Sequence, residues 1–343
     1  MQTKPYGDLF KLIRSLAGVS SFTSQEQGDI SRLINRRLNK AYNTSPIWDR
    51  YVVSNEERNV NSFTLSGLSD SSANTVYNGA YYLLGLNAAT DSASLNAPVY
   101  VKSNETTILD PIIVTKNMAT NQWSLQRTSG VTLNLDGTVT TVGAAETARL
   151  VQVANDDGSY ENFENPSSVK KWTLTGATGF PVFNETNVVA FDETYFNSSL
   201  TSSGKTPKNT IGEFIRIHRK RAFLNNSAIE YDFFVNSDGA NILNITSSDD
   251  THVFVTYKKP LTEFTTSSDF ENSTEEVPEE FFHYLAHSVY ADFLRMDGQH
   301  GKALTEEQLA QDYLDTQLEK IDIRSNNNSI NKKFSTYVNR QSR

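Results

Sequence analysis

The sequence predicts an α+β fold, in which a small helical bundle (an N-terminal helix pair plus two C-terminal helices) carries a large all-β inserted region. Apolar residues recur at helical spacing within residues 1–54 and again after residue 270. The residues between them show short alternating apolar runs separated by turn residues, the pattern of β domains. The 343 residues suffice for two domains, and the low hydrophobic content of 37% is typical of surface-rich folds or of subunits that complete their burial in an assembly.

Residues 1–54 are expected to form the N-terminal helical part of the core. An apolar helical stripe ends at Gly18, a residue type that commonly stops helices. A second helix is expected to begin at Thr23, because its hydroxyl and the carboxylate of Glu26 can form a capping box. A strand is expected to begin near Tyr51.

Residues 55–209 are expected to form the inserted β domain, and residues 210–270 a β region that rejoins the core. In "NLDGTV" the pair Asp136-Gly137 predicts a hairpin with a type I′ turn, because both residue types tolerate positive φ angles. The stretch "NSDGAN" in the later β region predicts a second hairpin turn.

A weak internal repeat, N/D-G-x-Y followed by a proline and then W-x-L, occurs twice in the inserted region. It is similar to small β modules of phage and bacterial surface proteins. Its aromatic residues either stack on sugar rings at the surface or form the cores of small sheets, and the second interpretation is favoured. The candidate surface aromatics are Tyr81, Tyr100, Trp123, Tyr160 and Trp172.

Residues 271–323 are expected to form the C-terminal helical part of the core. A helix over 278–296 is apolar almost all round, which predicts burial on most sides. A second helix is expected to start at a capping box of Thr305 and Gln308. Residues 324–343 are expected to be a basic extended tail, because they are too polar to fold alone.

The net charge of −9 is unevenly distributed. Residues 271–322 hold thirteen acidic residues against three basic ones, a balance of −10. Residues 323–343 hold five basic residues and no acidic one, and residues 1–50 hold eight basic residues against four acidic ones. The acidic segment is either a solvated face, which is the favoured interpretation, or the wall of a lumen or interface that repels a polyanion.

The residues that could carry chemistry do not form a convincing catalytic or metal site. The absence of cysteine excludes disulfides, thiolate metal sites and a cysteine nucleophile. His283 and His287 are spaced like two zinc ligands of one helix face, but Tyr284 stands where a hydrolytic zinc helix needs glutamate. Phosphate-binding glycine loops and a nucleophile elbow are also missing from the sequence. We expect no enzymatic activity, no metal and no cofactor.

The sequence also bears on localisation and on nucleic acid. The first residues lack the apolar run of a signal peptide, and no stretch is long and apolar enough for a membrane span, so we expect synthesis in a cytoplasm and no membrane association. The basic run "RIHRKR" alternates faces if it is a strand, so it cannot follow one phosphate chain. It either touches nucleic acid non-specifically or pairs with acidic helices of a neighbouring subunit, which is favoured.

The C-terminal stretch "VPEEFFHYLAHSVYADFLRMDGQHGKALTEEQLAQDYLDTQLEKI", together with the N-terminal helix pair, resembles the head-to-tail adaptor (connector) proteins of tailed bacteriophages. The similar features are a helix beginning Pro-x-x-Phe, a short turn and a helix with the pattern E-E-x-x-A-x-x-Y-L. These fall on Pro278, Phe281, Glu306, Glu307, Ala310, Tyr313 and Leu314. About 45 residues are covered well and the first 45 in outline, whereas the β region is not covered.

The resemblance implies a structural virion protein at the head-to-tail interface, in a ring of about twelve identical subunits below the portal protein. Double-stranded DNA would pass through the ring without sequence-specific binding, and tail, nozzle or fibre proteins would bind outside. The candidate portal-docking residues are Arg324, Lys332, Lys333, Phe334, Tyr337 and Arg340. The candidate residues of the subunit interface and helical core are Phe281, Phe282, His283, Leu285, His287, Tyr290, Phe293, Leu309, Tyr313 and Leu314. The candidate channel-lining acids are Glu306, Glu307, Asp312, Asp315 and Glu319. The alternative is a carbohydrate- or protein-binding virion surface or tail protein that acts through its β modules.

Overall fold

The structure is a computed structural model, and its described part is α+β with four α-helices and five β-sheets. The chain divides into two compact units, a helical unit (Met1–Val52 with Pro260–Arg343) and a β unit (Val53–Lys259). Of the region 210–270, expected to rejoin the helical core, residues 210–259 group with the β unit and the part from Pro260 groups with the helical unit. From residue 322 onward only the backbone is described. The structure describes residues 2–341 except 69–75, 104–110, 135, 145–148, 175–178, 197–204, 222–228, 246–251 and 266–272.

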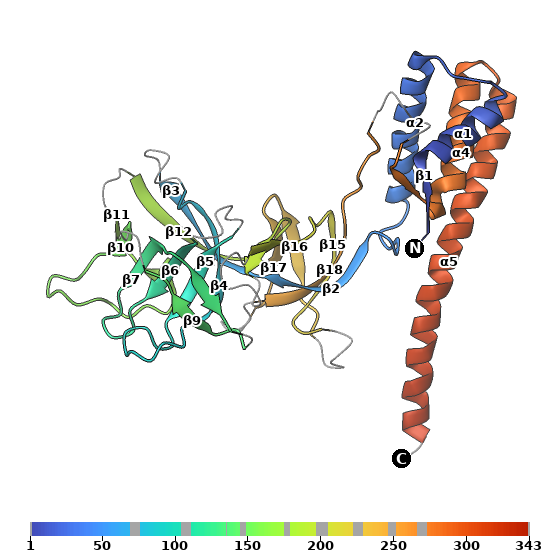
Figure 1. The fold of residues 1–343 in the computed structure, drawn as a ribbon. Helices are drawn as coiled ribbons and strands as arrows, with labels where there is room; N and C mark the ends of the chain where they lie inside the picture. The colour runs from blue at the N-terminus through green and yellow to red at the C-terminus, as the bar shows by residue number, and fades with distance from the viewer. Residues whose placement is uncertain are drawn as a thin grey trace. The chain divides into compact units, whose positions relative to one another are not determined.

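The helical unit is built from two stretches that are far apart in the sequence (Figure 1). Helix α4 is its central element, because it packs against α1, α2 and α5. A two-stranded antiparallel sheet of β1 and β19 brings the start of the chain to the start of α4. The elements are β1 (Thr3–Pro5), α1 (Tyr6–Ala17), α2 (Ser24–Asn43), β19 (Glu276–Pro278), α4 (Glu279–Met296) and α5 (His300–Gln341).

The ends of the first two helices follow the sequence signals. Gly18 takes the left-handed conformation with φ 70°, and its amide donates to the carbonyl of Ser15 at 3.1 Å, so the predicted stop of α1 is confirmed. The capping box at the start of α2 is also confirmed. The amide of Thr23 donates to the Glu26 carboxylate at 2.7 Å, and the amide of Glu26 donates to the Thr23 hydroxyl at 3.3 Å.

The core of the helical unit surrounds α4, whose side chains are buried on most sides as its sequence predicts. Phe281 and Leu285 are completely buried, and the Phe281 ring meets Trp48 edge to face with 4.8 Å between ring centroids. The Trp48 indole N–H donates to the carbonyl of Ala41 at 3.1 Å, so the residues after α2 are fixed on this core.

Helix α5 departs from the prediction at both ends. It begins at His300, and the Thr305 hydroxyl donates to the Gly301 carbonyl inside the helix, so the predicted capping box is wrong. Gly298, with φ 75°, completes the preceding turn before Thr305 is reached. The predicted extended tail is also wrong for the backbone up to Gln341, which continues as helix. The sequence has neither proline nor glycine after Gly301 to stop it.

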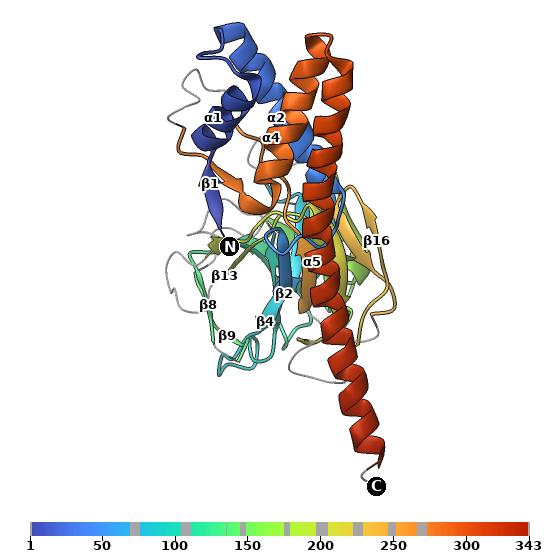
Figure 2. The same ribbon diagram turned by 90° about the vertical axis from the view of Figure 1, so that its right-hand side faces the viewer.

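Helix α5 is much longer than its packing partner. Its 42 residues correspond to about 63 Å at 1.5 Å per residue, against about 27 Å for the 18 residues of α4. Helix α5 runs back along α4 and, within the helical unit, continues past the first turn of α4 (Figure 2). Leu314 is buried and Leu318 and Ile321 are partly packed, so the described contacts with the core extend to Ile321.

The β unit contains a ten-stranded antiparallel sheet with the order β11-β10-β7-β6-β5-β4-β3-β12-β17-β16 (Figure 1). A three-stranded sheet, β15-β18-β2, and two separate hairpins, β8-β9 and β13-β14, complete it. A short 3-10 helix, η1, spans Pro166–Ser168. The strands are β2 (Val52–Asn59), β3 (Asn61–Leu68), β4 (Gly79–Leu86), β5 (Pro98–Lys102), β6 (Ile112–Lys116), β7 (Trp123–Arg127), β8 (Val131–Leu133), β9 (Val139–Val142), β10 (Leu150–Gln152), β11 (Trp172–Leu174), β12 (Gly179–Ala190), β13 (Thr194–Phe196), β14 (Lys205–Pro207), β15 (Glu213–His218), β16 (Phe233–Asn236), β17 (Gly239–Ile242) and β18 (His252–Lys258).

Both predicted hairpin turns join paired strands. Strands β16 and β17 pair antiparallel up to Asn236 and Gly239, which confirms the hairpin of "NSDGAN". Strands β8 and β9 also pair, but their pairing ends at Leu133 and Val139, so the two-residue type I′ turn is wrong. The Asp136 carboxylate accepts the amide of Thr138 at 3.0 Å, a local bond that stabilises the longer loop.

Candidate functional site

Helices α4 and α5 contain most of the residues that the sequence singles out. The residues expected at the subunit interface or in the helical core differ in burial: Phe281, Phe282, Leu285 and Leu314 are buried in the core of the unit, and His287, Tyr290 and Phe293 are partly buried. His283, Leu309 and Tyr313 are exposed and so remain candidates for contact with another molecule.

Tyr313 of α5 connects the two histidines of α4. Its ring stacks on His283 and on His287, with centroid distances of 5.2 and 5.4 Å. The Nδ1 atom of His287 lies 2.8 Å from the Glu306 carboxylate, so this pair joins α4 to α5. Partial burial of its ring, together with the nearby Lys4, lowers the pKa of His283. Among the residues that the structure describes, no three His, Asp or Glu side chains form a group that could hold a metal ion.

A network of two arginines and two carboxylates joins α2, α4 and α5. The buried Arg37 of α2 donates to both oxygens of Asp292 and, at 3.3 Å, to Glu307. Arg295 donates to Asp292 at 3.0 Å and to Glu307. The hydrogen bond from Arg295, and to a smaller extent that from Arg37, lowers the pKa of Glu307. The hydrogen bond with Asp292 raises the pKa of Arg37.

The five predicted channel acids divide into two groups. Glu306 and Glu307 are half-buried and bonded within the helical unit, Glu306 to His287 and Glu307 to Arg37 and Arg295. Asp312, Asp315 and Glu319 are exposed. Their spacing of three and four residues places them on one face of α5, which is therefore an acidic stripe.

A hollow of about 400 Å³ lies beside the first turn of α4. Its lining combines aromatic, acidic and basic side chains, including Trp48, Glu279, His283, Gln317 and Lys320. Ile321, the last residue of α5 with a described contact to the core, lines the same hollow, so α5 extends beyond the core from this point. The predicted tail residues follow within α5, and their side chains lie outside the described residues: Arg324, Lys332, Lys333, Phe334, Tyr337 and Arg340.

The aromatic residues of the β repeat are mostly internal. Tyr81, Tyr100 and Trp123 are buried in one core with Phe63, which agrees with the favoured interpretation as sheet cores and excludes these three as surface aromatics. They lie on β4, β5 and β7, whose side chains alternate between the two faces of the sheet. Trp172 is partly buried and stacks on Phe183, with 4.8 Å between ring centroids. Tyr160 is partly exposed.

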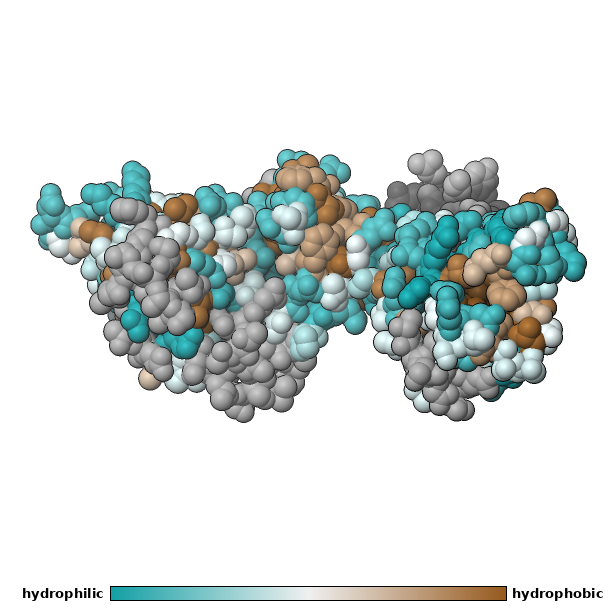
Figure 3. Space-filling model, turned by 90° about the horizontal axis from the view of Figure 1, so that it is seen from above, coloured by the Kyte–Doolittle hydropathy of each residue, from teal (hydrophilic) through white to brown (hydrophobic). Residues whose placement is uncertain are grey.

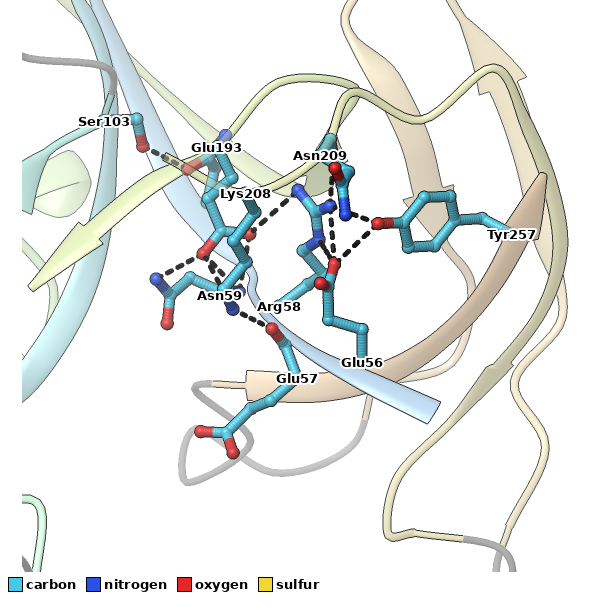
Figure 4. Close-up of polar contacts among 10 residues, drawn as sticks. Glu56, Glu57, Arg58, Asn59, Ser103, Glu193, Lys208, Asn209 and Tyr257 are labelled. Carbon is cyan, nitrogen blue, oxygen red and sulfur yellow. Dashed lines mark hydrogen bonds and ion pairs between the residues drawn. The ribbon is translucent and has the colours of Figure 1, made fainter. Parts of the chain in front are cut away.

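The β unit contains a buried charged cluster that the sequence did not reveal (Figure 4). Arg58 is fully buried in its centre and donates to Glu56 at 2.8 Å and to the hydroxyl of Tyr257 at 3.0 Å. The Tyr257 hydroxyl in turn donates to Glu56 at 2.9 Å. Glu193 and Lys208 complete the cluster. The Glu193 carboxylate lies 4.0 Å from the Arg58 guanidinium and 3.9 Å from the Lys208 ammonium.

Burial dominates the ionisation of this cluster. It raises the pKa of Glu193 and lowers the pKa of Lys208, in both cases against the opposing effect of the charged partner. Burial and the hydrogen bond with Glu56 also raise the pKa of Tyr257. The only local hint in the sequence is the run "NEERN" within a strand, whereas Glu193 follows Asn59 by 134 positions.

A patch of exposed apolar side chains lies on the edge of the large sheet. Strand β16 pairs with β17 on one side and ends the strand order on the other. Phe234 and Val235 are half exposed, as are Ile229 and Leu243 close by. Seen from above, apolar side chains gather over this part of the β unit (Figure 3). Among the described strands β16 is therefore an edge strand, and an exposed edge strand can pair with a further strand.

No helix of the described chain has the length and apolar character needed to cross a membrane. Comparison of the whole sequence with protein-family models, with curated proteins and with solved structures finds no match.

Proposed function

We propose that this chain is a structural virion protein, a head-to-tail adaptor that forms a ring below the portal and connects it to the tail. The single observation that best supports the proposal is the length of α5. The described contacts of this helix with its own core extend to Ile321, and its backbone continues as helix to Gln341. The sequence of this extension is polar, and a polar helix of this kind is typical of a segment that orders against another molecule.

In this proposal the helical unit acts as the bundle that joins identical subunits, about twelve in the ring. Leu304, Leu309 and Tyr313 of α5 expose apolar surface that a neighbouring subunit would cover. The acidic stripe of Asp312, Asp315 and Glu319 would face the channel. Weak repulsion of phosphates lets double-stranded DNA slide through without sequence-specific binding.

The two remaining parts have separate roles in the proposal. The basic residues 324–343 would dock on the portal protein. The β unit would lie outside the ring and contact tail, nozzle or fibre proteins. The carbohydrate-binding alternative is not retained, because three of its five aromatic residues are buried. The protein would be made in the host cytoplasm and act without enzymatic chemistry.

The experiment that tests the proposal is cryo-electron microscopy of the virion neck. We expect density for this chain as a closed ring beneath the portal, with α4 and α5 toward the axis and the β unit outside. Density for the chain at a fibre tip or on the capsid surface would contradict the adaptor function.

A further inference from the structure

Lys116, the last residue of β6, carries its ammonium group into a buried site without an acidic partner. The residue is only 8% exposed. Among the residues that the structure describes, no carboxylate lies within ion-pair distance of its Nζ atom. Lys208 of the same unit differs, because Glu193 lies 3.9 Å from its ammonium. A buried charge without a partner is costly, so a reaction that removes the charge of Lys116 would stabilise the site.

Two oxygen atoms from the segment that precedes η1 contact this ammonium group. Nζ donates to the side-chain Oδ1 of Asn162 at 2.5 Å and to the main-chain carbonyl of Phe163 at 3.0 Å. The indole N–H of Trp123, which pairs with Lys116 across β6 and β7, donates to the same carbonyl at 3.2 Å. Residues 162 and 163 are therefore held beside the lysine, although they follow it by 46 and 47 positions.

These contacts place an amine against the carbonyl group of a side-chain amide. The Cγ atom of Asn162 is one C=O bond, about 1.23 Å, from its Oδ1, so Nζ of Lys116 lies within about 3.7 Å of Cγ. Reacting atoms held at about 3–3.5 Å are in position to form a bond. An amine attacks a carbonyl only in its neutral form, and burial lowers the pKa of Lys116. The ring of Trp123, whose centroid lies 5.7 Å from Nζ, shields the amine on one side.

Glu164 supplies a carboxylate close to the two groups. It follows Asn162 by two residues, and its charge opposes the effect of burial on the pKa of Lys116. The carboxylate therefore lies near the ammonium without forming an ion pair with it, and is placed to accept a proton from an attacking amine. Asn162 and Glu164 are both exposed, so a leaving group released from Asn162 can pass directly into water.

We propose that Lys116 and Asn162 form an intramolecular isopeptide bond, which ties the segment before η1 covalently to β6. This goes beyond the adaptor proposal and does not depend on it. The Lys116 ammonium first loses one proton to water, and the lone pair of Nζ then forms a bond with Cγ of Asn162. Glu164 accepts a second proton from Nζ and passes it to Nδ2 of Asn162. The Cγ–Nδ2 bond breaks and ammonia leaves, so one amide replaces another without any oxidant or reductant, and the buried charge is removed.

Mass spectrometry of the full-length wild-type chain, purified and then denatured, tests the bond. We expect an intact mass about 17 Da below that of the sequence, because one ammonia is lost. Trypsin does not cleave after an acylated lysine, so digestion should give residues 103–127 joined to residues 150–170 as one species. An intact mass equal to that of the sequence, or cleavage after Lys116 with two separate peptides, would overturn the proposal.

Two variants show whether the loss of mass belongs to this pair. Lys116→Arg keeps the positive charge but removes the nucleophilic amine, so its mass should equal that of its sequence. The matched control is Lys102→Arg, because Lys102 donates to a main-chain carbonyl, that of Val76; it should keep the loss of about 17 Da. A loss that persists in Lys116→Arg would arise from cyclisation elsewhere in the chain and would contradict the proposal.

The role of Glu164 is tested by the rate at which the bond forms. The linked fraction of the chain is measured by mass at successive times after synthesis. In Glu164→Gln we expect linking to be about a hundredfold slower, the lower range for loss of a proton acceptor, whereas Glu161→Gln should link at the wild-type rate. Equal rates in the two variants would overturn the assignment of Glu164 as the proton acceptor.

Discussion

The two charged networks of the molecule have the same formal composition and opposite electrostatics. In the helical unit Arg37 and Arg295 pair with Asp292 and Glu307; in the β unit Arg58 and Lys208 pair with Glu56 and Glu193. The first network reaches solvent, since the side chains of Arg295 and Glu307 are 37% and 32% exposed. The second is almost closed to water around Glu193 and Arg58.

The difference shows that exposure to solvent decides whether the pKa of a glutamate in such a network is lowered or raised. The pKa of Glu307 is lowered because two arginines donate to it near water, whereas the pKa of Glu193 is raised because burial outweighs its cationic neighbours. A count of opposite charges would treat the two networks alike. Substitutions that remove one charge from each network can break or sharpen this comparison.

The largest effect is expected for Arg58→Met. This substitution leaves Glu56 and Glu193 without their shared cation in a buried site, so the free energy of unfolding of the β unit should fall by about 3–5 kcal/mol. Urea denaturation, followed by exchange of β-unit peptides, measures it. The control Arg216→Met removes an exposed cation and should cost less than about 1 kcal/mol. Similar costs for both variants would contradict the expected role of burial.

A smaller loss is expected for Arg37→Met in the helical unit. Arg37 is also buried, but Arg295 remains bonded to both Asp292 and Glu307 after the substitution. We expect the free energy of unfolding of the helical unit to fall by about 1.5–3 kcal/mol, the range for hydrogen bonds to charged groups. The double variant with Arg295→Met should lose more than the sum of the single losses, because no cation is then left. Additive losses would show that Arg295 does not compensate.

The pH dependence of the two units should have opposite sign. Glu307 has a lowered pKa in the folded protein, so its contribution is complete above about 4.5 and is lost as the pH falls through the folded value. The raised pKa of Glu193 means that the β unit loses stability as the pH rises from about 4.5. Hydrogen exchange of peptides from each unit, measured between about pH 3 and about pH 7, gives the change of stability with pH for both units. Glu307→Gln should flatten the first slope and leave the second unchanged.

The smallest effect on stability is expected for removal of residues 324–343. The described contacts of α5 with its core extend to Ile321, so the free energy of unfolding should change by less than about 1 kcal/mol. If the adaptor proposal is correct, the shortened protein should lose its binding to the portal protein. A pull-down with purified portal measures binding, and a melting curve of the same sample checks the fold. Undiminished binding would contradict the docking role of this segment.

Features that depend on neighbouring residues could be predicted from the sequence. The stop at Gly18 and the capping box of Thr23 and Glu26 need only a few residues to form, and both are confirmed. The apolar pattern of α4 predicts its burial for the same reason. The polar composition after residue 323 predicted an extended tail, but the absence of a helix breaker allows the backbone to continue α5.

Features that depend on distant residues could not be predicted. Nothing in the sequence relates Asn59 to Glu193 or Arg37 to Asp292, because their contacts arise only when the strands and helices pack. The aromatic repeat illustrates the same limit. The sequence identifies Tyr81 and Trp123 as members of a pattern, whereas the register of the sheet decides that both face the interior.

The strands by which the chain enters and leaves the β unit, β2 and β18, are neighbours in one sheet, and the amide of Asn55 lies 3.3 Å from the hydroxyl of Thr256. An inserted unit whose two ends lie side by side in this way can be removed or replaced as a whole. A short linker between Val52 and Pro260 should be enough to replace it, and a foreign domain with equally close termini could be grafted there. Evolution could exchange the β unit by the same route, changing what the protein contacts without redesigning the helices.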